Sequence, residues 1–250
     1  MFRLYDTRTG QAAEIALPPR GLLRMLVAGP PPDRPAHAGD LRTFLVADLI
    51  RRNAEHRHDL AVVATMVIAG DEHGGGNAAD GFFADAAALN IRPAEQTAGA
   101  QNVAEPAASR EIIVGTHSVR TGQVLPEVRL ADMAGRGLDP LALRLACLSG
   151  RYHEQADLAW DVLSHADEQI RRWRESVARW AELPSKPMCA KVTAQIAAAF
   201  DDDLDTPAAL RALNELEQDP EIPAGSKFES FLRADQLLGL DLPRDIGRTP

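Results

Sequence analysis

The sequence predicts an α/β protein, with a Rossmann-like parallel sheet in residues 1–138 followed by an all-α helical bundle in residues 139–250. Two observations predict this order. In the first part, short apolar runs alternate with a helical stretch, as in a βαβ unit. From Leu141 onward, the patterned stretches have helical periodicity. We therefore expect two domains that meet near residue 138.

The predicted βαβ unit begins with the apolar run LLRMLVA at 22–28, which Gly and Pro bound. Residues 41–57 place apolar side chains on one helical face, and residues 60–70 form a β-branched run typical of a buried parallel strand. The prolines of the intervening 29–40 segment exclude regular structure there. A right-handed crossover places this loop at the carboxyl edge of the sheet, where such folds bind nucleotides.

The remaining elements follow from the same kinds of pattern. We expect strands at 2–5 and at 111–119, the second alternatively a hairpin arm, a short helix at 82–91 and a loop at 93–109. Residues 73–81 are predicted to be a flexible break, although Asp71, Glu72 and His73 could form a polar lip of a pocket. Further helices are predicted at 141–149, 154–182, 187–200, 207–217 and 227–238.

Composition and charge narrow the function. The 250-residue chain is 45% hydrophobic and carries a net charge of −9, which disfavours broad nonspecific binding to nucleic acid. No apolar run reaches the roughly 18 residues of a membrane span, and the start MFRLYDTRTG lacks an apolar signal core, so we expect a cytoplasmic protein. The two cysteines, Cys147 and Cys189, cannot make a disulfide framework or a four-cysteine metal site.

The 29–40 loop holds the candidate functional residues. His37 can donate to a phosphate oxygen, and Gly39 lets a ligand approach the backbone. Together with the first amides of the following helix, these groups are expected to face one spot, where an adenine nucleotide or another anion would bind. A single His and Gly in a loop can also have no function. Asp40 at a helix start is more typical of a cap than of a magnesium ligand.

The run RMLVAGPPPDRPAHAGDLRTFLVADLIRR resembles the adenylate-binding segment of cysteinyl-tRNA synthetases, which are class I aminoacyl-tRNA synthetases. The spacing from Gly29 to His37 is that of the family pattern. The segments LYDTRTG, FFADAAALNIRPAE, LADMAGRGLDPLALRLACLSGRY and AFDDDLDTPAAL are also similar to family segments. The ligase that joins cysteine to glucosaminyl-inositol in mycothiol synthesis shares these motifs, so both relatives stay open. The matching single residues are Arg42, Thr43, Asp48, Arg51 and Arg52.

This resemblance implies a class I Rossmann-like sheet, an ATP or AMP site that works with Mg²⁺, and tRNA as a partner. It assigns nucleotide-binding positions to Gly29, His37, Gly39, Asp40 and Arg120. Of these, His37 and Asp40 occupy the places of two family histidines that help to stabilise the α-phosphate, and they are the catalytic candidates.

Three departures from the family pattern alter this expectation. Ala28 stands where the family has its first zinc-binding cysteine, and no cysteine precedes Cys147, so no zinc is expected. Asp40 replaces the second histidine and would face a triphosphate with like charge. The 115–133 stretch has none of the lysines that stabilise the departing pyrophosphate, and Arg120 is at most a partial substitute.

Three hypotheses follow. The first is a truncated and diverged relative, a pseudoenzyme that keeps a nucleotide or aminoacyl-adenylate pocket without zinc and without standard aminoacylation. The second is an active but diverged ATP-dependent amino-acid ligase. The third is a non-catalytic module that binds a protein partner through its helices.

Two further features have structural alternatives. The run Asp201–Asp205 looks like a metal loop, but we expect Asp205 or Thr206 to cap a helix there. The arginines of the 154–182 helix suit a solvated face beside buried tryptophans better than a tRNA contact.

Overall fold

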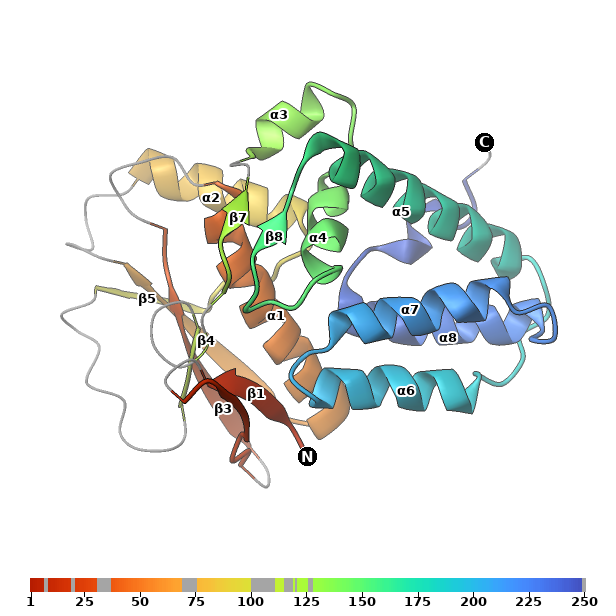
Figure 1. Cartoon of the computed structure of the whole chain (residues 1–250), viewed down its shortest axis with the longest axis horizontal. Coiled ribbons are helices and arrows are strands. Elements are labelled where there is room, and N and C mark those ends of the chain that lie inside the picture. The colour runs from red at the N-terminus through yellow and green to blue at the C-terminus, as the bar shows by residue number, and fades with distance from the viewer. Residues whose placement is uncertain are drawn as a thin grey trace.

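A parallel sheet forms one side of the molecule, and helices fill the other side (Figure 1). The computed structural model describes residues 1–6, 9–18, 21–30, 37–68, 76–99, 111–114, 119, 121–125 and 128–248. The four-stranded sheet has the order β5-β4-β3-β6, with β3 at Leu22–Ala28, β4 at Ala61–Ile68, β5 at Gln96–Gly99 and β6 at Glu111–Val114. The predicted α/β class with a parallel sheet is therefore confirmed.

The predicted βαβ unit is present. β3 and β4 pair in parallel, with Leu22 opposite Ala61 and Ala28 opposite Val67. The connecting helix α1 (Ala38–His58) contacts both strands. Since α1 follows β3 along the chain, it begins at the edge of the sheet where the carboxyl ends of the strands lie, as expected for this topology.

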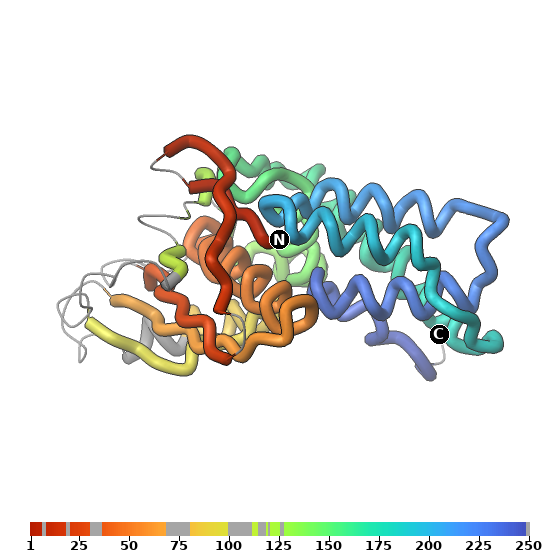
Figure 2. Tube along the Cα trace, turned by 90° about the horizontal axis from the view of Figure 1, so that it is seen from below, coloured from red at the N-terminus to blue at the C-terminus, as the bar shows by residue number. Residues whose placement is uncertain are grey.

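The chain after residue 128 is mostly helical, and Figures 1 and 2 place α5 to α8 on the side of α1 away from the sheet. Their shared core includes the fully buried side chains of Trp173, Val177 and Phe231. None of the helices in the described ranges has the length and hydropathy that a bilayer crossing needs. The elements are α3 (Leu130–Ala134), α4 (Pro140–Leu148), α5 (Trp160–Ala181), α6 (Ala190–Asp201), α7 (Thr206–Gln218), α8 (Ala224–Leu238) and the short 3-10 helix η2 (Leu242–Asp245).

The second half is not purely helical, and the prediction of one helix over 154–182 was wrong at its start. β8 (Ala156–Asp157) pairs in parallel with β7 (Val124–Leu125), and α5 begins only at Trp160. The buried guanidinium of Arg42 on α1 donates to the carbonyls of Gly122 and Glu154, each two residues before one of these strands, and so links the two segments. Local periodicity carries no information about such a distant contact.

The smaller elements also differ from prediction. The strand expected at 2–5 belongs to a separate antiparallel hairpin of β1 (Arg3–Asp6) and β2 (Gln11–Glu14). β5 lies inside the predicted loop at 93–109, and α2 (Gly76–Ala88) begins inside the predicted break. β6 and Val119, which bridges to Val114, account for the described part of 111–119.

A buried charge cluster joins α1 to the helical half. The side chain of Asp48 has no exposed surface, and its Oδ2 accepts from Arg52 Nε and from Arg144 Nη2, each at 2.7 Å. Burial alone would raise the pKa of Asp48, but Arg144 and Arg52 outweigh it and hold this pKa below its ordinary value. We call these three residues the Asp48 cluster.

The Asp48 cluster also fixes two chain segments from outside α1. Arg144 Nε donates to the Leu238 carbonyl at 2.7 Å, and Arg52 Nη2 donates to the Asn90 carbonyl at 2.9 Å. Gly239 ends α8 with φ 67°, and a Cβ there would lie 2.7 Å from Arg144 Nη2. Only glycine combines this left-handed conformation with so close an approach to a guanidinium.

Replacing Arg144 by Met should destabilise the fold strongly. The change removes the Arg144 guanidinium from the buried Asp48 carboxylate, which keeps Arg52 at 2.7 Å and Arg92 at 4.0 Å, and it removes a donor from the Leu238 carbonyl. The expected loss in free energy of unfolding is about 3–5 kcal/mol, measured by urea denaturation.

Arg248→Met is the matched control, because the Arg248 side chain is 68% exposed and its ion pair within the described ranges is with Asp245 at 3.5 Å. Its expected cost is below about 1 kcal/mol. Equal losses for the two variants would show that the Asp48 cluster does not stabilise the junction.

Candidate nucleotide site

The first turn of α1 forms around a capping box. His37 is the N-cap residue in extended conformation, and its Nδ1 accepts from Gly39 N at 3.0 Å. Asp40 at the third helical position accepts from His37 N through Oδ2, also at 3.0 Å. Each of the two side chains satisfies a backbone amide that the helix start would otherwise leave without a partner. The expectation that Asp40 serves in a cap is met in this form, with His37 as the N-cap.

The capping geometry determines the tautomer of His37. Because Gly39 N donates to Nδ1, a neutral His37 ring carries its proton on Nε2. The distance from Nδ1 to Asp40 Oδ2 is 3.6 Å, too long for a hydrogen bond, so the hydrogen-bond partner of Nδ1 is Gly39 N. The side chains of His37 and Asp40 are 21% and 11% exposed, so both are largely covered.

Two glycines, one after β3 and one in the first turn of α1, allow close packing at the carboxyl edge of the sheet. A Cβ on Gly39 would lie 2.8 Å from His37 Cε1, so the imidazole can fold back over the helix start only above a glycine. Gly29 N donates to the Val67 carbonyl at 2.8 Å, and a Cβ on Gly29 would lie 3.0 Å from that oxygen. The spacing of Gly29 and Gly39 therefore has a packing explanation beside the nucleotide-binding one.

The first amides of α1 already have acceptors within the chain. Ala38 N donates to the Val128 carbonyl at 3.1 Å, Gly39 N to His37 Nδ1, and Asp40 N to the His37 carbonyl at 3.0 Å. An anion that used the amides of residues 38 and 39 would therefore have to displace the His37 ring and the Val128 carbonyl. The sequence pattern places these groups at one point but does not show that they are paired with each other.

Arg42 and Thr43 hold the chain that follows Arg120 against α1. The buried Arg42 guanidinium donates to the carbonyls of Gly122 at 2.9 Å, Glu154 at 2.7 Å and Arg151 at 2.9 Å. Thr43 Oγ1 lies 3.2 Å from Thr121 Oγ1. The chain just after position 120 is thus held against the first turns of α1. Arg120 itself and residues 31–36, 71–75 and 115–118 lie outside the described residues.

The other residues that match the family pattern have structural partners. Asp48 and Arg52 belong to the buried cluster described above. Arg51 forms a bidentate salt bridge with Glu95, in which Nη1 donates to Oε1 at 2.7 Å and Nη2 donates to Oε2 at 2.8 Å. Glu95 Oε2 also accepts from Ala64 N at 2.7 Å. These contacts join α1 to the β4–β5 edge of the sheet. The described geometry gives Asp48, Arg51 and Arg52 a role in holding the architecture.

The acidic run before α7 is occupied by partners within the chain. Asp201 binds Arg57 and His58, and Asp202 pairs with Arg3 at 3.0 Å. Asp205 is the N-cap of α7 and accepts from Ala208 N at 3.0 Å, so the capping alternative is confirmed. Among the described residues, no group of three or more His, Cys, Asp and Glu side chains has an arrangement suited to a metal ion.

Asp203 ties the acidic run to the amino-terminal strand. Its Oδ1 accepts from Tyr5 N and from the Tyr152 hydroxyl, each at 2.7 Å. Burial, with the negative charge of Asp203 beside it, raises the pKa of Tyr152 above its ordinary value, so the hydroxyl stays protonated and donates. Two segments that match the family, LYD and DDDLD, thus contact each other (Figure 2).

The residues present do not fit the zinc set of the resembling family. Ala28 ends β3 and has no ligand atom. Cys147 is buried in α4, where burial raises the pKa of its thiol to about 11 despite Arg42 and Arg144. A thiol with such a pKa stays protonated at neutral pH and is a poor zinc ligand.

The arginines of α5 divide between solvent and core. Arg171 and Arg172 are exposed, and Trp173 and Trp180 are buried, as expected. Arg174 differs, because it is buried and binds Asp139 Oδ2 at 2.6 Å and the Leu240 carbonyl at 3.1 Å.

The sheet, its crossover helix and the capped α1 start define an α/β protein with a Rossmann-like sheet. No model of a known protein family matches the chain. Curated proteins that are similar to it include ligases. An L-cysteine:1D-myo-inositol 2-amino-2-deoxy-alpha-D-glucopyranoside ligase from Mycolicibacterium smegmatis is 36% identical over 119 residues, which is 46% of this chain and 28% of the relative.

Ligases of the same name give similar matches. The one from Segniliparus rotundus is 38% identical over 121 residues, 46% of this chain and 27% of the relative. The one from Rhodococcus erythropolis is 40% identical over 89 residues, 35% of this chain and 20% of the relative. The matched region thus spans under a third of each of these ligases. The predicted relationship to this group of synthetase-like ligases is confirmed.

Gly39→Ala should weaken the start of α1. The new Cβ would overlap the His37 ring, so the ring must leave the cap and Gly39 N loses its acceptor. We expect a loss of about 1 kcal/mol in free energy of unfolding, the usual size of a lost N-cap. Urea denaturation measures this loss.

Gly81→Ala in α2 is the matched control, because a Cβ there meets nothing within 4 Å. It should stabilise the protein by about 0.5–1 kcal/mol through helix propensity. A stabilising Gly39→Ala would mean that His37 does not cap α1.

Proposed function

We propose that this chain is a ligase relative that binds an adenine nucleotide or an aminoacyl-adenylate at the start of α1, without zinc and without standard aminoacylation. The similarity to cysteine ligases over nearly half of the chain carries this proposal. The topology supports it, because α1 begins at the carboxyl edge of β3 and β4, where open α/β sheets bind ligands.

His37 and Gly39 are the residues we assign to the phosphate. His37 would donate through Nε2–H, because Nδ1 accepts from Gly39 N. Gly39 keeps the helix start narrow enough for a phosphate to approach its backbone. Arg120 would add positive charge from the neighbouring segment, which Arg42 and Thr43 hold near α1. Mg²⁺, when bound with ATP, would neutralise phosphate charge.

Asp40 is the residue expected to weaken the binding of a triphosphate at this site. Its carboxylate bonds to His37 N at the helix start, so its negative charge lies beside the proposed phosphate position. A carboxylate opposes the charge of a triphosphate more than that of a monophosphate. Together with the stretch lacking lysine up to residue 185, this charge disfavours stabilisation of a departing pyrophosphate.

The two-domain division remains part of this proposal. Residues 1–138 would carry the nucleotide site, and residues 139–250 would form a helical domain that meets α1 through the Asp48 cluster. A protein partner or tRNA would use this helical side.

One observation favours the alternative of a non-catalytic interaction module. The amides of Ala38 and Gly39 are already paired within the chain, as a helix start without a ligand requires. An active, diverged ATP-dependent ligase is the other alternative, and it needs these amides or His37 to change partners when the substrate binds.

Calorimetry with ATP, AMP and a non-hydrolysable aminoacyl-adenylate analogue tests the nucleotide site. We expect AMP and the analogue to bind more tightly than ATP. Asp40→Asn keeps an oxygen for His37 N but removes the charge, so it should narrow the gap between ATP and AMP, and Asp40→His should do the same.

An exposed acid gives the matched control. Asp245→Asn makes the same change of net charge at the far end of the chain and should leave the ATP-to-AMP ratio unchanged. Absence of heat with every ligand at millimolar concentration would favour the interaction module. A wild-type preference for ATP would show that Asp40 does not face the phosphates.

Cysteine-dependent ATP–pyrophosphate exchange should be undetectable. The reason is twofold: the negative charge of Asp40 lies beside the proposed phosphate position, and the first 185 residues contain no lysine to stabilise pyrophosphate. The measurement is radiolabelled pyrophosphate exchange with and without cysteine. A rate within about a hundredfold of an ordinary synthetase corresponds to a loss of only about 2.7 kcal/mol in transition-state binding, and it would support the active ligase instead.

A further inference from the structure

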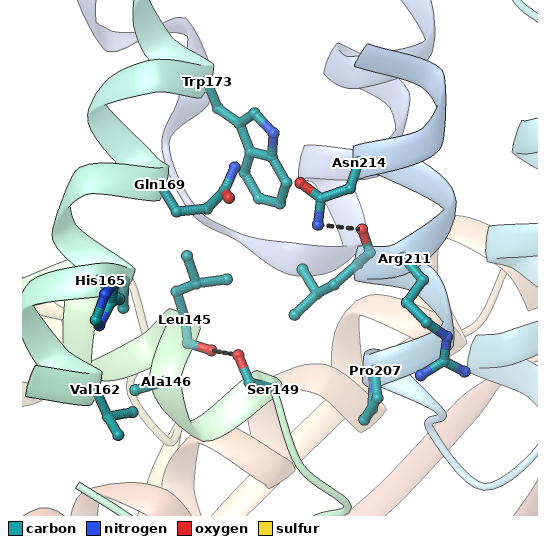
Figure 3. Close-up of a pocket in the computed structure, with 12 residues that line it drawn as sticks. Leu145, Ala146, Ser149, Val162, His165, Gln169, Trp173, Pro207, Arg211 and Asn214 are labelled. Carbon is teal, nitrogen blue, oxygen red and sulfur yellow. Dashed lines mark hydrogen bonds between the residues drawn. The ribbon is translucent and has the colours of Figure 1, made fainter. Parts of the chain in front are cut away.

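A cavity lies in the helical half, far along the chain from the α1 start. Its floor is α4 with Leu145, Ala146 and Ser149, and its two walls are α5 and α7 (Figure 3). Its volume is about 440 Å³, within the range of small-molecule sites. The deeper lining is apolar and includes Leu145, Trp173 and Leu210.

One polar group in this cavity lacks a partner. Gln169 Nε2 is buried, and within the described part of the chain no acceptor lies within hydrogen-bond range of it. Its Oε1 accepts from Arg172 Nη2, which orients the amide with its nitrogen away from that arginine. Figure 3 shows the Gln169 amide reaching from α5 toward Trp173 and Asn214 on the inner side of the cavity. A buried N–H requires an acceptor, which a bound molecule can supply.

The charge of the cavity is opposite to that of the chain. None of its twelve lining residues is acidic, although the whole chain carries −9. Arg211 lies on the α7 wall, and no carboxylate oxygen of the described residues forms an ion pair with it. His165 lies on the α5 wall, where its Nδ1 donates to the Asp161 carbonyl at 2.7 Å.

Carboxylates on the elements around the cavity form contacts elsewhere. Glu217, beyond the Trp173 end, accepts from Trp173 Nε1 at 3.1 Å and lies 3.3 Å from Arg172 Nε. The adjacent groove also contains Arg211 and three acids. Asp202 pairs with Arg3 and Asp205 pairs with Arg151, while Glu215, one turn further along α7, makes no ion pair with Arg211 among the contacts of the described residues. Arg211 is therefore left as a positive charge at the rim of the cavity.

We propose that this cavity binds a small organic carboxylate with a flat apolar body. The apolar body would pack against Leu145, Leu210 and Trp173. The carboxylate would accept from Gln169 Nε2, and Arg211, whose side chain extends outward at the rim, would attract its charge from a longer distance. This inference is independent of the nucleotide site, because none of its residues contributes to the α1 start.

The test uses 2-naphthoate and its uncharged counterpart 2-naphthamide, each titrated into the full chain by calorimetry at low ionic strength. Both carry an acceptor oxygen on the same ring system, so their difference reports the charge. We expect 2-naphthoate to bind more tightly by about fivefold, the upper range for one exposed charge pair. Equal affinities, or no heat from either compound at millimolar concentration, would overturn the proposal.

Two variants separate the charge from the hydrogen bond. Arg211→Gln should reduce 2-naphthoate binding to the level of 2-naphthamide and leave the amide unchanged. Gln169→Leu should weaken both compounds by about two- to tenfold, because both lose the same donor. The exposed position of Arg211 makes its variant safe for folding, and thermal melts check both proteins.

Arg248→Gln is the control that makes the same change of net charge at an exposed site outside the cavity. It should leave both affinities unchanged. If Arg248→Gln weakens 2-naphthoate as much as Arg211→Gln does, the effect is general electrostatics and the site assignment is wrong.

Discussion

The buried carboxylate of Asp48 is the constraint on which the arrangement of the two halves depends. A charge without exposed surface must be neutralised, and Asp48 takes one guanidinium from its own helix and one from α4. Each arginine has further donors, and these bind carbonyls at Asn90 and Leu238. The sheet half and the helical half therefore share one set of hydrogen bonds, and α1 belongs structurally to both.

Several residues in the segments that resemble the family likewise make contacts that hold the fold together. Tyr5 contacts Asp203, Arg51 contacts Glu95, and Gly39 makes room for His37. Each pair joins segments far apart in the sequence or closes a helix end. Similarity in these segments supports a common architecture, and it says nothing about position 40 of α1, where Asp40 stands in place of a family histidine.

Periodicity predicted the parts of the fold that local sequence determines. The 22–28 and 60–70 runs became adjacent parallel strands, and the helices after Leu141 lie close to their predicted ranges. It failed where distant contacts shape the backbone, as just before β8, where the Glu154 carbonyl accepts from Arg42 of α1. For the site, the sequence located the α1 start, but it could not reveal that His37 and Val128 already occupy the amides there. The buried roles of Arg144 and Arg174 had no local signal, because arginine on a helix is usually solvated.

The contacts at the carboxyl end of α8 have a consequence for folding during translation. Arg52 is translated early, yet one of its acceptors is the carbonyl of Gln236, and the neighbouring Gly239 seals the guanidinium pair. Until α8 leaves the ribosome, Arg52 lacks the Gln236 carbonyl and Arg144 lacks the Leu238 carbonyl. The junction between α1 and the helical half is thus expected to stay incompletely packed, within reach of chaperones, until α8 has been synthesised.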